Sequence, residues 1–105
     1  MKLLEHKHLI IRVEVNNPPT DEAWLHNWLN TLVEKIGMKV CRGPITAYVD
    51  MPGNEGLTGV VVIETSHIAI HVWDAVKPAL VQLDVYTCFA LNKDIIFAVV
   101  EECWL

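Results

Sequence analysis

The sequence has little positive charge, with 8 lysines and arginines against 13 aspartates and glutamates and a formal net charge of −5 at pH 7. Binding to nucleic acid or to an anionic membrane needs clustered positive charge, so we expect neither kind of partner. No apolar run approaches the roughly 20 residues of a transmembrane helix. Residues 1–6 are too polar for a signal peptide, and we therefore expect a cytoplasmic protein.

Cysteine is also scarce, and its three positions are Cys41, Cys88 and Cys103. An odd number without close spacing predicts neither a disulfide framework nor a metal site. The length of 105 residues predicts a single domain over residues 1–105. Hydrophobic residues make up 52% of the chain, which is more than usual, and the excess predicts an interface between subunits.

One amphipathic helix is predicted between Thr20, its expected N-cap, and Gly37, the residue expected to end it in a left-handed conformation. Apolar residues on one helical face support this helix: Leu25, Trp28, Leu29, Leu32, Val33 and Ile36.

Runs of β-branched and alternating residues predict most of the remaining chain to be strands. The predicted strands cover residues 8–15, 38–49, 58–64, 67–73, 80–88 and 95–100, with a break in the second at Gly43 and Pro44. Residues 74–78 are predicted to form a turn or a short helix. One helix with five or six strands indicates an α+β two-layer sandwich, in which an antiparallel sheet carries the main helix on one face.

The segment from Thr58 to Trp73 carries the strongest indication of chemistry. An apolar strand runs into Ser66 and His67, a second histidine follows at His71, and the block Asp84-Val85-Tyr86-Thr87-Cys88 lies downstream. A serine at the end of a strand can attack the preceding peptide bond and become a pyruvoyl group. Each residue alone has an ordinary structural explanation, because serine is common in turns and cysteine is often a small buried apolar residue.

Two histidines four residues apart could suggest a metal site at His67 and His71. Along a regular strand they are about 13 Å apart, which is too far to share one ion. We therefore expect no metal.

Taken together and in this order, these blocks resemble the small prokaryotic S-adenosylmethionine decarboxylases. The resemblance is close over residues 56–89 and extends over residues 8–50 only in the order of elements. It implies a proenzyme that cleaves itself between Thr65 and Ser66. It also implies that the resulting pyruvoyl group forms a Schiff base with S-adenosylmethionine and acts as the electron sink for decarboxylation, in spermidine and polyamine biosynthesis. A homodimer is implied as well.

The resemblance assigns roles to five residues of this sequence. Ser66 is the pyruvoyl precursor, His71 the base in processing, and Thr58 the hydroxyl that assists the processing intermediate. Cys88 returns a proton to the substrate carbon after CO2 leaves. Asp74 takes the place of an acidic substrate contact.

The sequence also departs from the family pattern. Thr65 replaces the usual Glu, and Phe89 replaces the usual Gly. No aromatic residue near residues 50–52 matches the one that stacks on adenine, and the family's second helix after the cysteine block is expected to be missing. Ser66 and His71 are five residues apart, so a regular strand would place them on opposite faces, and their cooperation requires a bend or a chain break at Ser66.

Two alternative functions follow from these departures. The loss of the adenine-stacking position suits a pyruvoyl-dependent decarboxylase of arginine or ornithine. The change at position 65 and the missing helix suit an unprocessed, non-catalytic relative that binds a small molecule or regulates a full-length homologue. 

Overall fold

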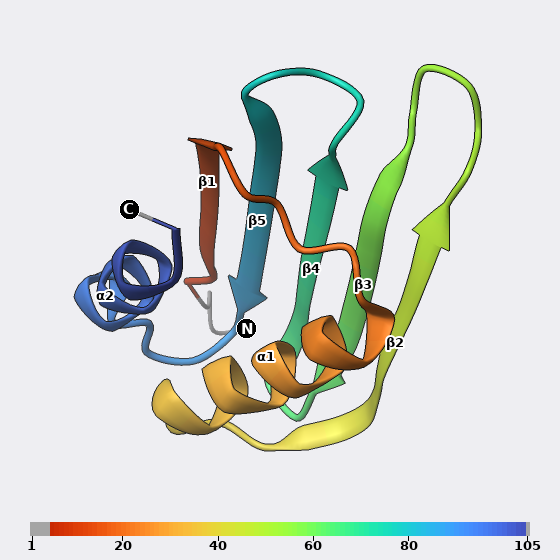
Figure 1. Cartoon of the computed structure of the whole chain (residues 1–105). Coiled ribbons are helices and arrows are strands. Elements are labelled where there is room, and N and C mark those ends of the chain that lie inside the picture. The colour runs from red at the N-terminus through yellow and green to blue at the C-terminus, as the bar shows by residue number, and fades with distance from the viewer. Residues whose placement is uncertain (1–4, 105) are drawn as a thin grey trace.

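The computed structural model describes residues 5–104, in which a five-stranded sheet is combined with two helices (Figure 1). The elements in chain order are β1 (Lys7–Val15), α1 (Glu22–Lys35), β2 (Val40–Val49), β3 (Gly56–Ile63), β4 (Ser66–Trp73), β5 (Ala79–Thr87) and α2 (Lys93–Trp104). Part of the segment considered for a signal peptide, residues 1–4, lies outside the described residues. Neither described helix is both long and apolar enough to cross a membrane.

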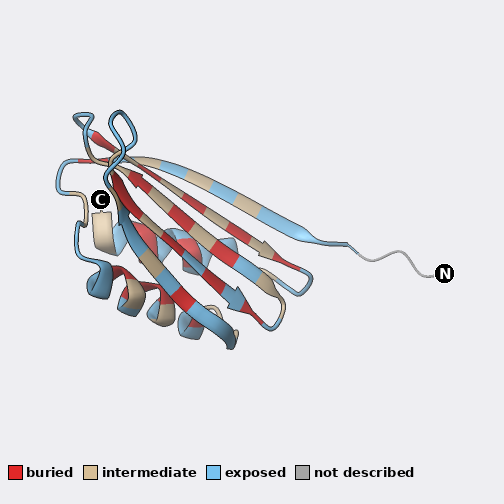
Figure 2. Cartoon of the chain, turned by 90° about the vertical axis from the view of Figure 1, so that its right-hand side faces the viewer, coloured by how far each residue is buried: buried red, intermediate tan, exposed pale blue. Residues whose placement is uncertain are grey.

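The sheet has the order β1-β5-β4-β3-β2, and every neighbouring pair is antiparallel. Strands β2 to β5 are joined by consecutive hairpins. Strand β1 adds to the outer edge of β5, and the chain then crosses the whole sheet through α1 to reach the other edge at β2 (Figure 1). The predicted α+β two-layer fold is confirmed, with a second helix on the same side of the sheet as the first (Figure 2).

Helix α1 begins one residue later than predicted. Asp21, and not Thr20, is the N-cap, because its Oδ1 accepts a hydrogen bond of 3.0 Å from the backbone N–H of Ala23. The helix ends as predicted at Gly37, whose φ of 73° lies in the left-handed region that costs glycine little.

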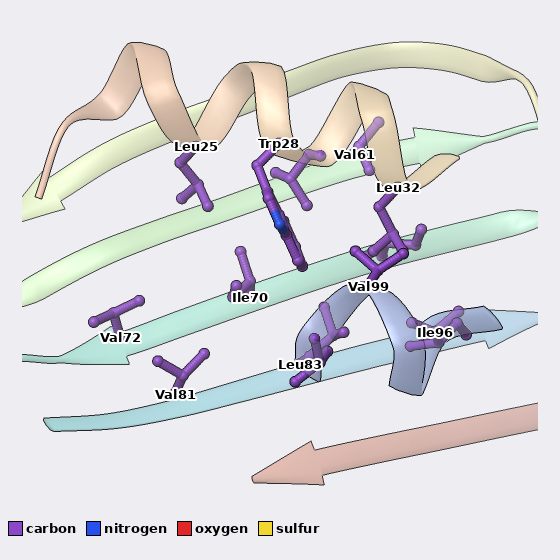
Figure 3. Close-up of a cluster of buried hydrophobic side chains, with 14 of the residues drawn as sticks. Leu25, Trp28, Leu32, Val61, Ile70, Val72, Val81, Leu83, Ile96 and Val99 are labelled. Carbon is purple, nitrogen blue, oxygen red and sulfur yellow. The ribbon is translucent and has the colours of Figure 1, made fainter. Parts of the chain in front are cut away.

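The core lies between the helices and one face of the sheet (Figure 3). Close packing of α1 on β3 depends on Gly59, since a Cβ atom there would lie only 2.9 Å from Leu29 Cδ1 and 3.0 Å from Leu25 Cδ2. The side chains that fill this layer are apolar and buried: Leu25, Leu29, Leu32, Val61, Ile70, Leu83, Ile96 and Val99 among others.

The predicted strand over residues 95–100 is wrong, because this segment lies inside helix α2. Its buried residues, Ile96, Val99 and Val100, recur at the spacing of a helical face, whereas strand residues on one face alternate. Asn92 caps the start of the helix, which begins at Lys93. Its Oδ1 accepts hydrogen bonds from the backbone N–H groups of Asp94, at 3.0 Å, and Ile95, at 3.4 Å. The expected loss of the family's second helix is therefore also wrong.

Strand β2 is continuous from Val40 to Val49, so the predicted break at Gly43 and Pro44 is replaced by a local irregularity. The pairing of β2 with β3 shifts its register between Val40 and Ile45. Residues 74–78 form a loop of bends without a helix.

The face of the sheet away from the helices is open and carries apolar residues side by side with histidines and charged residues. Alternation along β4 buries Ile68, Ile70 and Val72 against the helices and leaves the residues between them on the open face. Directly paired residues share a face, and one row across the open face consists of Ile10, Asp84, Ala69, Val60 and Ile45.

Candidate active site

The predicted cleavage bond lies in the tight turn between β3 and β4, at the end of the sheet where β5 also finishes (Figure 1). Ile63 pairs with Ser66, so Glu64 and Thr65 are the two turn residues. Ser66 has a φ of 143°, a region that residues with a side chain rarely adopt. Such a backbone conformation costs about 1–3 kcal/mol and occurs often at reactive sites.

Cys88 lies beside this bond. The backbone N–H of Cys88 donates a hydrogen bond of 2.9 Å to the carbonyl oxygen of Thr65. This is the carbonyl that the Ser66 hydroxyl would attack, so the donor points at the oxygen on which negative charge would develop. The side chain of Cys88 is exposed. The structure thus brings Thr65, Ser66 and Cys88 together.

Thr87, the last residue of β5, holds the chain in place just before Cys88, and sequence reasoning did not single it out. It pairs with Ser66 across β4 and β5, and it is the one buried polar residue in the part of the chain that the structure describes. Its hydroxyl accepts a hydrogen bond of 3.0 Å from the backbone N–H of Phe89. Thr87 therefore orients both Cys88 and Phe89 next to the cleavage turn.

Thr58 and His71 form a second group, on β3 and β4. They are directly paired across the two strands, and the Thr58 Oγ1 lies 3.2 Å from the His71 Nδ1. Both side chains are partly buried on the open face of the sheet.

The two groups do not meet within one copy of the chain. Ser66 and His71 are at positions five residues apart on the continuous strand β4, a distance of about 16 Å at the usual rise per residue. The unusual φ of Ser66 is local to the turn and does not bring His71 closer, because His71 remains paired with Thr58.

Asp74 lies just beyond β4, at the opposite end of that strand from Ser66. Both of its carboxylate oxygens accept from the Tyr48 hydroxyl, at 2.8 and 3.0 Å. The hydrogen bond to Asp74, together with partial desolvation and the negative charges of Asp74, Asp50 and Glu55, raises the pKa of Tyr48. Tyr48 is an aromatic residue two positions before the segment 50–52, in which the family pattern places its adenine-stacking aromatic, and sequence reasoning therefore overlooked it.

Imidazole rings surround Tyr86 on the open face, near the cleavage turn. The ring of His67 stacks on Tyr86 with centroids 5.4 Å apart, and His6 is hydrogen-bonded to the Tyr86 hydroxyl. His8 Nε2 lies 2.8 Å from Asp84 Oδ1. Only the pairing of β1 with β5 brings His6 and His8 here, so their sequence positions gave no signal.

The match to a known family covers all of these helices and strands. A family model described as S-adenosylmethionine decarboxylase matches residues 7–104, from the first residue of β1 to the last of α2. The chain belongs to the S-adenosylmethionine decarboxylase family. Enzymes of this family generally use a pyruvoyl group, and the family resemblance seen in the sequence is confirmed. A search of curated proteins finds no match to the chain.

Proposed function

We propose that this chain is a pyruvoyl-dependent decarboxylase of S-adenosylmethionine, in polyamine biosynthesis, that cleaves itself between Thr65 and Ser66. The observation that carries the proposal is the hydrogen bond from the Cys88 backbone N–H to the Thr65 carbonyl oxygen, 2.9 Å long, at a strained serine. Family membership supports the decarboxylase chemistry.

The cleavage begins with the Ser66 hydroxyl, which attacks the Thr65 carbonyl carbon while the Cys88 N–H stabilises the oxyanion. Collapse of this adduct breaks the Thr65–Ser66 C–N bond and leaves an ester between the Thr65 carbonyl and Ser66 Oγ. Removal of the Ser66 α-proton then breaks the ester, and Thr65 keeps the carboxylate. The remaining dehydroalanine takes up water and releases ammonia, which leaves a pyruvoyl group at position 66.

The residues around Ser66 fit this group. The pyruvoyl carbonyl, once formed, supplies an electron sink for loss of CO2 from the substrate. Cys88, whose backbone N–H binds the Thr65 carbonyl and whose thiol is exposed, returns a proton to the substrate carbon. Asp74 lies eight residues from Ser66, about 26 Å along β4, so Asp74 and its partner Tyr48 can contact that substrate only from a second copy of the chain.

His71 and Thr58 assist cleavage in a second copy of the chain. The open face exposes Ile10, Ile45 and Val60, and such a face is expected to pair with another subunit. In the proposed dimer the open faces of two copies meet, and a twofold axis between them runs perpendicular to β4 near Ala69, about midway between positions 66 and 71. This axis would place the His71 of one copy opposite the Ser66 of the other. A homodimer of this kind resolves the separation of about 16 Å within one copy.

Intact-mass spectrometry of the purified, denatured chain tests the proposal. We expect two fragments, residues 1–65 and residues 66–105, the second blocked by a pyruvoyl group. Ser66→Ala should give one full-length chain without decarboxylase activity. Activity in that variant, or a wild-type chain that stays intact on long incubation, would contradict the proposal.

An unprocessed relative is the second candidate function. It is favoured by two departures from the family pattern beside the cleavage turn, Thr65 in place of Glu and Phe89 in place of Gly. The Thr65 hydroxyl donates to Met38 Sδ at 3.3 Å, and Thr65 and Phe89 line one small pocket. Helix α2 is present, so a missing second helix does not favour this function. A wild-type chain that remains uncleaved and co-purifies with an active homologue would favour this function.

The substrate is tested separately from cleavage. If the chain is processed, release of CO2 from S-adenosylmethionine, arginine and ornithine should be compared under the same conditions. Turnover of arginine or ornithine alone would replace the proposed substrate while leaving the proposed cleavage intact.

A further inference from the structure

A pocket of about 390 Å³ lies between the start of α1 and the end of α2. The segment that joins β1 to α1 forms one wall. The other walls include Asp21, Trp24, Cys103 and Trp104. None of these residues belongs to the decarboxylase site described above, so the pocket needs a separate explanation.

Tryptophan rings dominate one side of this pocket. Trp24 and Trp104 line it with ring centroids 6.4 Å apart, and Trp28 packs behind both of them. Trp28 projects from α1 into the core, where it is buried (Figure 3), whereas Trp24 remains 38% exposed. Indole ring faces carry partial negative charge and attract cations, tryptophan more strongly than the other aromatic residues.

Asp21 is the one charged residue among the described residues that line the pocket, and its charge has the same sign as the ring faces. Asp21 contributes a carboxylate, of which only Oδ1 is engaged, by the N–H of Ala23, among residues 5–104. The last turn of α2 has no basic residue and includes Glu101 and Glu102, at the end of the helix where the macrodipole is negative. Within residues 5–104, no lysine or arginine is among the residues that line the pocket, and Lys35 has its Nζ 3.9 Å from Glu102.

We propose that this pocket binds an organic ammonium ion. The cationic head lies against the faces of Trp24 and Trp104 and near the free oxygen of Asp21, and the alkyl part fills the apolar remainder of the pocket. This binding does not depend on cleavage at Ser66, and it concerns residues that take no part in that reaction.

Isothermal titration calorimetry with choline as the probe tests this site, using both the wild-type chain and the Ser66→Ala chain. The control ligand is 3,3-dimethylbutan-1-ol, which has the shape of choline without its charge. We expect saturable binding of choline to both chains and much weaker binding of the neutral alcohol. Trp24→Leu, which keeps an apolar side chain but removes the ring, should weaken choline binding about tenfold.

Asp21→Asn separates the charge of Asp21 from its structural role. Asparagine is as good an N-cap as aspartate, so the helix keeps its cap while the pocket loses a carboxylate. Choline should bind this variant several-fold more weakly, and the same charge change at the exposed Asp94, outside the pocket, should have no effect. Equal binding of choline and the neutral alcohol would overturn the proposal, as would equal effects of the two asparagine variants or an absence of saturable binding.

Discussion

Thr58 and His71 are directly opposite each other on β3 and β4, with the Thr58 Oγ1 3.2 Å from the His71 Nδ1. The pair lies on the open face of the sheet, about 16 Å along β4 from the serine that it is proposed to help. A residue pair so far from Ser66 in its own chain can act on cleavage only through another copy.

Complementation between two inactive variants is the first prediction. His71→Ala and Ser66→Ala should each stay intact when produced alone, since one lacks the base and the other the nucleophile. When the two are produced together, the His71→Ala chain should be cleaved in mixed dimers, because its Ser66 faces an intact His71. Mass spectrometry distinguishes the two chains.

Ser66→Ala should remain whole in every mixture, which provides the internal control. If the His71→Ala chain also remains whole in verified mixed dimers, then His71 does not act across the interface.

The second prediction separates the backbone of Cys88 from its thiol. Cys88→Ala keeps the N–H that binds the Thr65 carbonyl, so self-cleavage should continue while decarboxylation falls. Cys88→Pro removes that N–H, and loss of one oxyanion donor should slow cleavage by about 10²–10³-fold. Cleavage is followed by gel electrophoresis over time, with circular dichroism to verify that both variants fold.

Equal cleavage rates in the two Cys88 variants would show that the hydrogen bond of 2.9 Å is not used in processing.

The third prediction concerns the titration of Tyr48. The carboxylate of Asp74 raises the pKa of Tyr48, first because it accepts a hydrogen bond from the neutral hydroxyl and also because its charge would repel the phenolate. Asp74→Asn should therefore lower this pKa toward its ordinary value, as measured by phenolate absorbance in a Tyr86→Phe background that leaves Tyr48 as the one titrating tyrosine.

The raised pKa of Tyr48 also makes the stability of the folded chain depend on pH. A pKa that is higher in the folded chain contributes stability below the ordinary value of 10.0, and this contribution is lost as pH rises through the folded pKa. The titration would refute the assignment if Asp74→Asn left the pKa of Tyr48 unchanged.

The fourth prediction tests the cap of α2. Asn92→Ala removes the side-chain acceptor at the start of the helix and should lower the free energy of unfolding by about 1 kcal/mol, measured by urea denaturation. Asn92→Asp retains an acceptor and should cost much less. An equal loss of stability in both variants would mean that the cap does not stabilise α2.

Local patterns in the sequence were sufficient for most of the fold. The apolar face of α1 and the alternation along β4 depend only on neighbours in the chain, and both elements were predicted within a few residues of their observed bounds. The strand predicted over residues 95–100 was wrong because a run rich in β-branched residues favours a strand locally. In the folded chain, burial of Ile96 and Val99 against α1 and the sheet outweighs that preference.

The sequence by itself determined the family, through the blocks around Ser66 and Cys88, and the alternation that makes one face of the sheet apolar toward the helices. Only the tertiary structure decided which of the proposed site residues meet. The pairing of β4 with β5 brings Cys88 to the Thr65 carbonyl, while the pairing of β3 with β4 holds Thr58 and His71 apart from them. The reason is physical: the register of a sheet is fixed by contacts between strands distant in sequence, which spacing along one strand does not encode.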